Sequence, residues 1–201
     1  MRLQIKQSMF LCVVICQILI LLSHAEQSVG QQVPVEKLAQ SWNSTGSVDW
    51  TSAAILALLS KSAYEDDTEL MNFVAIGMGF DRCETFQAEN SFAYALIGEK
   101  VVVIAFRGTE FTSLSDWKTD AYAKFLRVPG VGRMHTGFHT AYGHVKNEVE
   151  TTIENNRGKQ IWLTGHSLGG AMAVVCGVNL RQNNLADPVS YTHLRAPRDR
   201  G

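Results

Sequence analysis

The stretch QIWLTGHSLGGAMA, residues 160–173, decides the fold. Its first five residues are typical of a short buried strand. They lead directly into Gly165-His166-Ser167-Leu168-Gly169, which is a Gly-x-Ser-x-Gly turn, and a run rich in small residues then favours a helix. This order of strand, turn and helix is the context in which the pattern presents a serine hydroxyl at the carboxyl end of a strand.

The two glycines of this turn have a mechanical role. The turn forces Ser167 into a strained backbone conformation, and side chains at Gly165 or Gly169 are expected to collide with the neighbouring strand and helix. The hydroxyl of Ser167 then lies beside a helix N-terminus, which favours developing negative charge. We therefore predict Ser167 as a nucleophile and the backbone N–H of Leu168 as an oxyanion donor. The simpler alternative is a glycine-rich turn capped by the serine.

His166 precedes the serine, but we do not predict it to be the general base. Adjacent residues on so sharp a turn point in different directions, so its ring cannot easily reach the hydroxyl of Ser167. We interpret His166 as a packed or hydrogen-bonding support.

The remaining periodicity predicts an α/β fold. Apolar residues at helical spacing indicate helices at 49–63 and 140–155, and the second helix is expected to stop before Gly158. Residues 91–97 alternate like a half-buried strand, and 101–106 form a continuous β-branched and apolar run, so the two are predicted to form a hairpin. Strands separated by helices favour a mainly parallel sheet with helices on both faces and a site at the carboxyl ends of its strands.

Three motifs resemble those of a known family. AFRGTE at 105–110, HTGFHTAY at 135–142 and TGHSLGGA at 164–171 occur in the order and spacing of the class 3 lipases, the fungal-lipase-like α/β-hydrolases. Three motifs in order are far more specific than one Gly-x-Ser-x-Gly turn. The resemblance implies an α/β-hydrolase fold and a carboxylic ester hydrolase that forms an acyl-enzyme on Ser167.

The resemblance also implies roles for residues after the second predicted strand. Thr109 would supply the second oxyanion donor through its backbone N–H, assisted by its hydroxyl; the alternative is a threonine that merely ends a strand. Arg107 and His135 would be structural. A lid is expected at 110–118, where apolar and charged residues are interleaved. Two interpretations of this segment remain: an amphipathic flap at a lipid–water interface, and a surface helix with Trp117 in the core.

The expected catalytic triad is incomplete. In this fold the order is Ser, then Asp or Glu, then His, and in the resembling enzymes both later residues lie beyond the last position of this chain. A serine without a base is a weak nucleophile, so we predict that the 201-residue polypeptide is inactive. For the full-length protein the expected substrate is a triacylglycerol or related lipid ester. The alternatives are a phospholipase, a feruloyl-type esterase and a catalytically dead lipase-like binding protein.

The sequence predicts three segments: a signal peptide, a hydrolase domain and a carboxyl-terminal tail. Arg2 and Lys6, an apolar run at 9–22 and small residues near Ala25 predict a cleaved signal peptide at 1–25 and hence a secreted protein. Residues 26–187 are expected to be the amino-terminal part of the hydrolase domain. We interpret 188–201 as a non-native tail, because it resembles a translated sequencing adapter; the alternative is a native strand and loop at 191–198.

The composition gives little indication of a binding partner or of a disulfide bond. A formal net charge of −1 with scattered basic residues gives no footprint for nucleic acid. No cofactor, metal or stable protein partner is implied. After removal of the signal, Cys83 in an expected polar loop and Cys176 in an apolar stretch remain, and their pairing cannot be decided from spacing.

Overall fold

The computed structural model describes residues 50–64, 67–108, 125–128, 132–186, 188 and 190–194. The predicted signal peptide, Thr109 and the expected lid at 110–118 lie outside these residues, as do 195–201. No helix among the described residues is long and apolar enough to cross a membrane.

Four helices and seven strands make up the described part of the chain. In chain order they are α3 (Trp50–Ser62), α4 (Thr68–Gly77), β1 (Arg82–Ala88), β2 (Ser91–Ile97), β3 (Val101–Phe106), β4 (Phe125–Val128), β5 (Gly132–His135), α6 (Thr136–Asn155), β6 (Gln160–His166), α7 (Leu168–Gln182) and β7 (Ser190–Leu194). All four elements predicted from periodicity, and the strand and helix around Ser167, are present.

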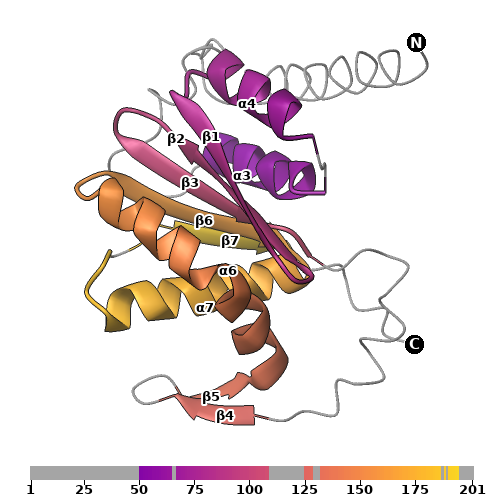
Figure 1. Ribbon diagram of the computed structural model, residues 1–201, viewed down its shortest axis with the longest axis vertical. Helices are drawn as coiled ribbons and strands as arrows, with labels where there is room; N and C mark the ends of the chain where they lie inside the picture. Colours follow the sequence, from indigo (N-terminus) through magenta and orange to yellow (C-terminus); the bar gives the residue numbers. More distant parts are fainter. Residues whose placement is uncertain are drawn as a thin grey trace.

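Five strands form one sheet in the order β1-β2-β3-β6-β7 (Figure 1). Strands β1, β2 and β3 pair antiparallel, which confirms the predicted hairpin of β2 and β3. Strands β3, β6 and β7 pair parallel, so the sheet is mixed within the described strands. The expectation that β2 is half-buried was wrong: all seven of its residues are buried, because helices cover both faces of the sheet there.

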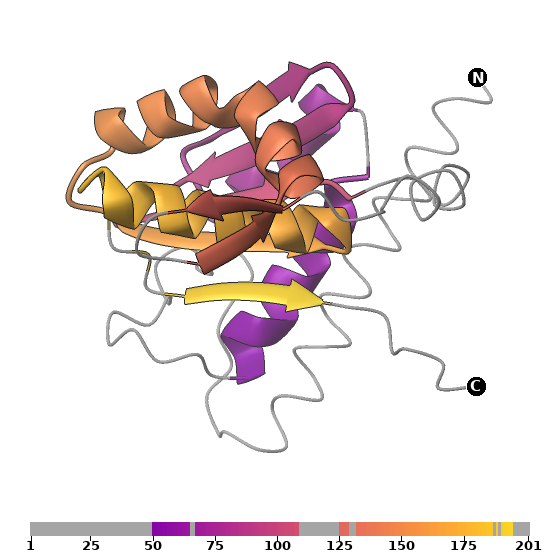
Figure 2. The same ribbon diagram turned by 90° about the horizontal axis from the view of Figure 1, so that it is seen from below.

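Two helical layers enclose the sheet (Figure 2), and buried apolar side chains form a separate core on each face. Helices α3 and α4 cover one face, where the core includes Leu56, Tyr94 and Trp162. Helices α6 and α7 cover the other face, with a core that includes Ile104 and Val145. This is the predicted α/β arrangement with helices on both faces, and burial of apolar side chains in both layers holds the strands in place.

Some features of the fold could not be predicted from the periodicity of apolar residues. Strand β1 has the polar sequence RCETFQA and lies at the edge of the sheet, so its pairing with β2 rather than an apolar pattern makes it a strand. Cys83 therefore lies within this strand, half-buried against the α4 side of the sheet, and its assignment to a polar loop was wrong. Helix α6 begins four residues before the predicted start at 140, because the Nδ1 atom of His135 accepts the N–H of Gly137 at 3.1 Å and caps the helix.

The segment after α7 forms the last strand of the sheet. Residues of β7 pair parallel to β6 from Trp162 to His166. This arrangement is the one expected if 191–198 is a native strand and loop. The non-native origin of 188–201 stays a prediction.

Candidate active site

The turn that carries Ser167 joins β6 to α7 at the carboxyl end of a parallel strand. Ser167 has φ 57° and ψ −121°, a positive φ that residues with a Cβ atom rarely adopt. Its side chain is exposed although the strand before it and the helix after it are mostly buried. Strain of this kind costs about 1–3 kcal/mol and persists only where the surrounding structure enforces it.

The glycines of the turn are required by backbone packing. A Cβ atom at Gly165 would overlap the carbonyl of Gly169 and lie 2.8 Å from the nitrogen of Gly170. A Cβ atom at Gly169 would overlap the carbonyl of Phe106 at the end of β3. Both obstacles are backbone atoms, which cannot move aside as a flexible side chain can, so the predicted collision with helix and strand is confirmed.

Ser167 does not act as a helix cap. It occupies the cap position of α7, yet its side chain makes no capping hydrogen bond. The alternative in which the serine is present to cap a glycine-rich turn therefore lacks its expected hydrogen bond. The first turn of α7 starts at Leu168 and contains no acidic residue, so no carboxylate of that turn offsets the positive end of the helix dipole.

The segment after β3 lies directly beside the serine. Phe106 pairs with Gly165 in the parallel register, and β3 continues into Arg107 and Gly108 at the same edge of the sheet. A Cβ atom at Gly108 would lie 3.3 Å from the Cβ of Ser167, and it would also overlap the carbonyl oxygen of His166. Thr109 follows immediately in the sequence but lies outside the described residues.

Tyr64, at the end of α3, also reaches this corner and was missed in the sequence. Its hydroxyl oxygen lies 3.1 Å from the Nδ1 atom of His166, and the two rings meet edge to face with centroids 6.1 Å apart. Nothing in the sequence connects residues that are 102 positions apart, so only the tertiary structure finds this contact. His166 is thus a hydrogen-bonding support, as its position on the turn predicts.

Arg107 and His135 have contacts that suit structural roles. The guanidinium carbon of Arg107 lies 4.8 Å from the ring centroid of Phe92, and its backbone N–H donates to the carbonyl of Phe92 at 2.9 Å. His135 caps α6 and stacks at 4.7 Å, centroid to centroid, on Phe138. Neither residue is placed in the turn that carries Ser167.

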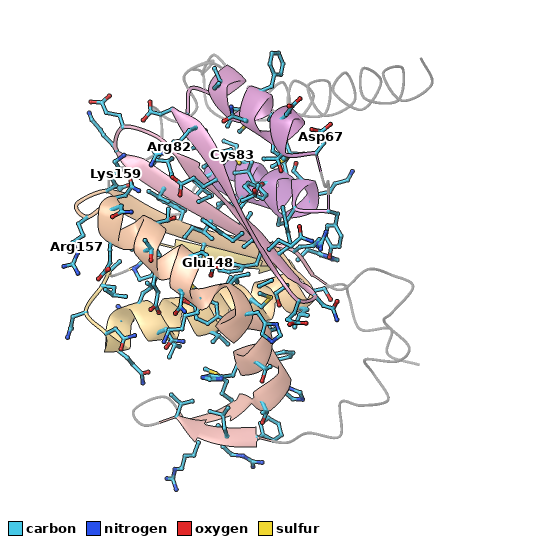
Figure 3. The ribbon with its side chains drawn as sticks, in the orientation of Figure 1. Asp67, Arg82, Cys83, Glu148, Arg157 and Lys159 are labelled. Atoms are coloured by element: carbon cyan, nitrogen blue, oxygen red, sulfur yellow. The ribbon has the colours of Figure 1, made fainter. Side chains whose placement is uncertain are left out.

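The two described cysteines offer no competing nucleophile. Both are free thiols; Cys83 lies on β1 (Figure 3) and belongs to the α3–α4 core, while Cys176 belongs to the opposite core. Burial raises the pKa of each thiol to about 12, so both stay protonated at neutral pH. Among the described residues no group of three or more His, Cys, Asp or Glu could hold a metal ion.

These features define a class of protein. A strained, exposed serine between a buried parallel strand and the N-terminus of a helix, with glycines where backbones meet, has the geometry in which α/β-hydrolases present their nucleophile. Comparison with known proteins agrees: the family model "Lipase (class 3)" matches residues 103–198. The match includes the last four residues of β3, the turn with Ser167 and β7.

Known lipases are similar to this chain in sequence and structure. A lipase of Rhizomucor miehei is 36% identical over 90 residues, which are 42% of this chain and 24% of that protein. A triacylglycerol lipase of Arabidopsis thaliana is 25% identical over 171 residues, covering 60% of this chain and 33% of that one. A fungal lipase–inhibitor complex superposes with a TM-score of 0.55 at 25% identity, covering 69% and 58%.

The chain is thus similar to the class 3 lipases over residues 103–198, and it has the α/β-hydrolase fold. Its matched regions span about a quarter to a third of the length of these two curated relatives.

Proposed function

We propose that the full-length protein is a secreted serine hydrolase that cleaves lipid esters, with triacylglycerol as the favoured substrate class. Ser167 attacks the ester carbonyl, the backbone N–H groups of Leu168 and Thr109 stabilise the oxyanion, and water then releases the acid from the acyl-enzyme. The observation that carries the proposal is the strained, exposed Ser167, which makes no capping bond and lies beside Gly108.

The substrate class is supported by the family and by relatives that are named as lipases and as triacylglycerol lipases. Secretion is supported by the basic, apolar and small-residue pattern of residues 1–25. The base that accepts the proton of Ser167 is expected beyond the last position of this chain. We therefore propose that the 201-residue polypeptide does not turn over esters.

A fluorophosphonate probe tests the nucleophile directly. The full-length protein should label on Ser167, and Ser167→Ala should lose labelling together with ester hydrolysis by about four orders of magnitude or more, because the hydroxyl supplies the acyl acceptor. The 201-residue chain serves as a comparison and should hydrolyse no ester above background. A folded full-length protein that neither labels nor hydrolyses would instead favour the dead, lipase-like binding protein.

The substrate class needs a second assay. Emulsified triacylglycerol, a phospholipid vesicle, a feruloyl ester and a soluble short-chain ester should be compared by kcat/KM on the same preparation. The proposal expects the highest value for emulsified triacylglycerol. A preference for phospholipid or feruloyl ester would keep the mechanism on Ser167 and reject the triacylglycerol assignment.

A further inference from the structure

Tyr64 lies where three segments of the chain meet. It follows the end of α3, and its hydroxyl contacts both His166, which precedes the nucleophile, and Gly108, which follows β3. A Cβ atom at Gly108 would come within 2.5 Å of this hydroxyl oxygen, so the glycine is needed for the approach. One phenol thus joins the two loops that lie on either side of Ser167.

The protonation state of Tyr64 bears on both contacts. Burial raises the pKa of Tyr64, so the phenol keeps its proton, while a hydrogen bond from the backbone of Gly108 acts in the opposite sense and lowers the pKa. A backbone group that stabilises the phenolate is an N–H donor, so Gly108 donates to the phenol oxygen. The phenol oxygen lies 3.1 Å from Nδ1 of His166, and donation of the Tyr64 O–H to this nitrogen requires the imidazole proton to be on Nε2.

Helix α3, which ends two residues before Tyr64, is itself fixed to the sheet. The hydroxyl of Thr164 on β6 donates to the carbonyl of Leu56 at 3.0 Å, and the hydroxyl of Tyr94 on β2 donates to the carbonyl of Leu59 at 2.6 Å. Thr164 and Tyr94 are completely buried. Buried hydrogen bonds of this kind are costly to break, so the end of α3 provides a rigid support for Tyr64.

We propose that Tyr64 is a positioning residue for the reaction assigned to Ser167: it sets the separation between the nucleophile turn and the loop that begins at Gly108. This inference rests on the proposed function. The close approach of the phenol oxygen to Gly108 fixes the point from which that loop extends.

The proposal predicts a particular kinetic signature. Oxyanion donors act on the transition state, and a small displacement of a preorganised group far from the reacting atoms can cost about 100-fold in rate. Tyr64→Phe should lower kcat of the full-length protein by about 10- to 100-fold with little change in KM. Tyr142→Phe is the matched control, because it removes a buried phenol hydroxyl in the opposite core, 3.4 Å from Glu150, and should leave kcat unchanged.

Variants at His166 test whether the phenol acts through this contact. His166→Ala removes the acceptor and should resemble Tyr64→Phe, and the double variant should be no slower than the slower single one. His166→Asn keeps an acceptor oxygen near the position of Nδ1 and should recover most of the rate. All rates should be normalised to sites titrated with the fluorophosphonate, so that loss of folded protein does not count as loss of kcat.

The outcomes separate the two proposals. A lowered kcat in Tyr64→Phe with recovery in His166→Asn supports the positioning role. An active wild type whose Tyr64→Phe variant keeps full kcat per titrated site overturns that role and leaves the proposed function intact. A folded wild type without labelling or hydrolysis overturns both, and an equal loss of kcat in Tyr142→Phe would show a general effect of losing a buried hydroxyl.

Discussion

The antiparallel half and the parallel half of the sheet have different roles. In the antiparallel half, β1, β2 and β3 are joined by short turns and their side chains fill the two cores. In the parallel half, β3 and β6 end at the same edge, and both continue into segments that meet around Ser167. Parallel neighbours bring their carboxyl ends together, whereas an antiparallel neighbour ends at the opposite edge.

The two halves also differ in how tightly a residue with positive φ is enclosed by its surroundings. Two non-glycine residues with positive φ show it: Glu89 at 51° in the exposed turn between β1 and β2, and Ser167 at 57° in the turn between β6 and α7. The first occurs in an ordinary hairpin turn. The second is enclosed by glycines that cannot take a side chain, so the packing enforces its strain and the scaffold of the other half supports that packing.

The largest expected effect concerns the glycines of the parallel half. Gly165→Ala and Gly169→Ala should each lower the free energy of unfolding by about 3 kcal/mol or more, because the new methyl group meets backbone atoms. Gly143→Ala on α6, where no atom lies within 4 Å of the new Cβ, should instead be neutral or stabilise by about 0.5–1 kcal/mol. Urea denaturation measures both; equal effects at the three positions would contradict the packing described for the turn.

A smaller effect is expected from the hydroxyls that fix α3 to each half. Thr164→Val acts in the parallel half and Tyr94→Phe in the antiparallel half, and each removes one buried hydrogen bond to a carbonyl of α3. Each should cost about 1–2 kcal/mol in the free energy of unfolding. Thermal or urea unfolding of the single and double variants checks this. If only one variant is destabilised, the two halves do not share the support of α3 as described.

The strained residues should gain stability when they are replaced by glycine. Ser167→Gly and Glu89→Gly should each raise the free energy of unfolding by up to about 1 kcal/mol, since glycine adopts a positive φ without strain. Ser167→Gly should abolish hydrolysis by the full-length protein, while Glu89→Gly should retain it. A loss of stability in Ser167→Gly would mean that the turn is not strained in solution.

The smallest effect is expected from surface ion pairs. Glu154 lies in the last turn of α6 and Arg157 follows this helix (Figure 3 labels Arg157); their side chains are 3.2 Å apart, and those of Arg157 and Glu154 are 61% and 51% exposed. Arg157→Ala should change the free energy of unfolding by about 0.5 kcal/mol or less, and added salt should remove the difference. Arg82→Ala on β1, whose pair with Glu84 is also partly exposed, is the counterpart in the antiparallel half. A larger loss in the free energy of unfolding for either variant would mean that its arginine also contributes through packing.

How much could be predicted differs between the halves. Strand β3 is a continuous apolar run, β6 contains the apolar stretch Ile161-Trp162-Leu163, and the motif around Ser167 is local, so the sequence was sufficient for the fold class and for the turn that carries Ser167. Strand β1 is polar and exists through its pairing with β2, and α6 starts earlier than predicted because His135 caps it. Hydrogen bonds to partners distant in the sequence have no periodicity, so Tyr64 could not be found in this way.

The sequence alone determined a serine between two glycines, preceded by a strand and followed by a helix, because short-range sterics dictate that turn. It also determined the family resemblance, through three motifs in order. The tertiary structure alone decided which segments surround that serine: the parallel register places Gly108 beside Ser167, and the packing of α3 brings Tyr64 to His166. Contacts between distant segments depend on how the layers pack, and no local pattern encodes them.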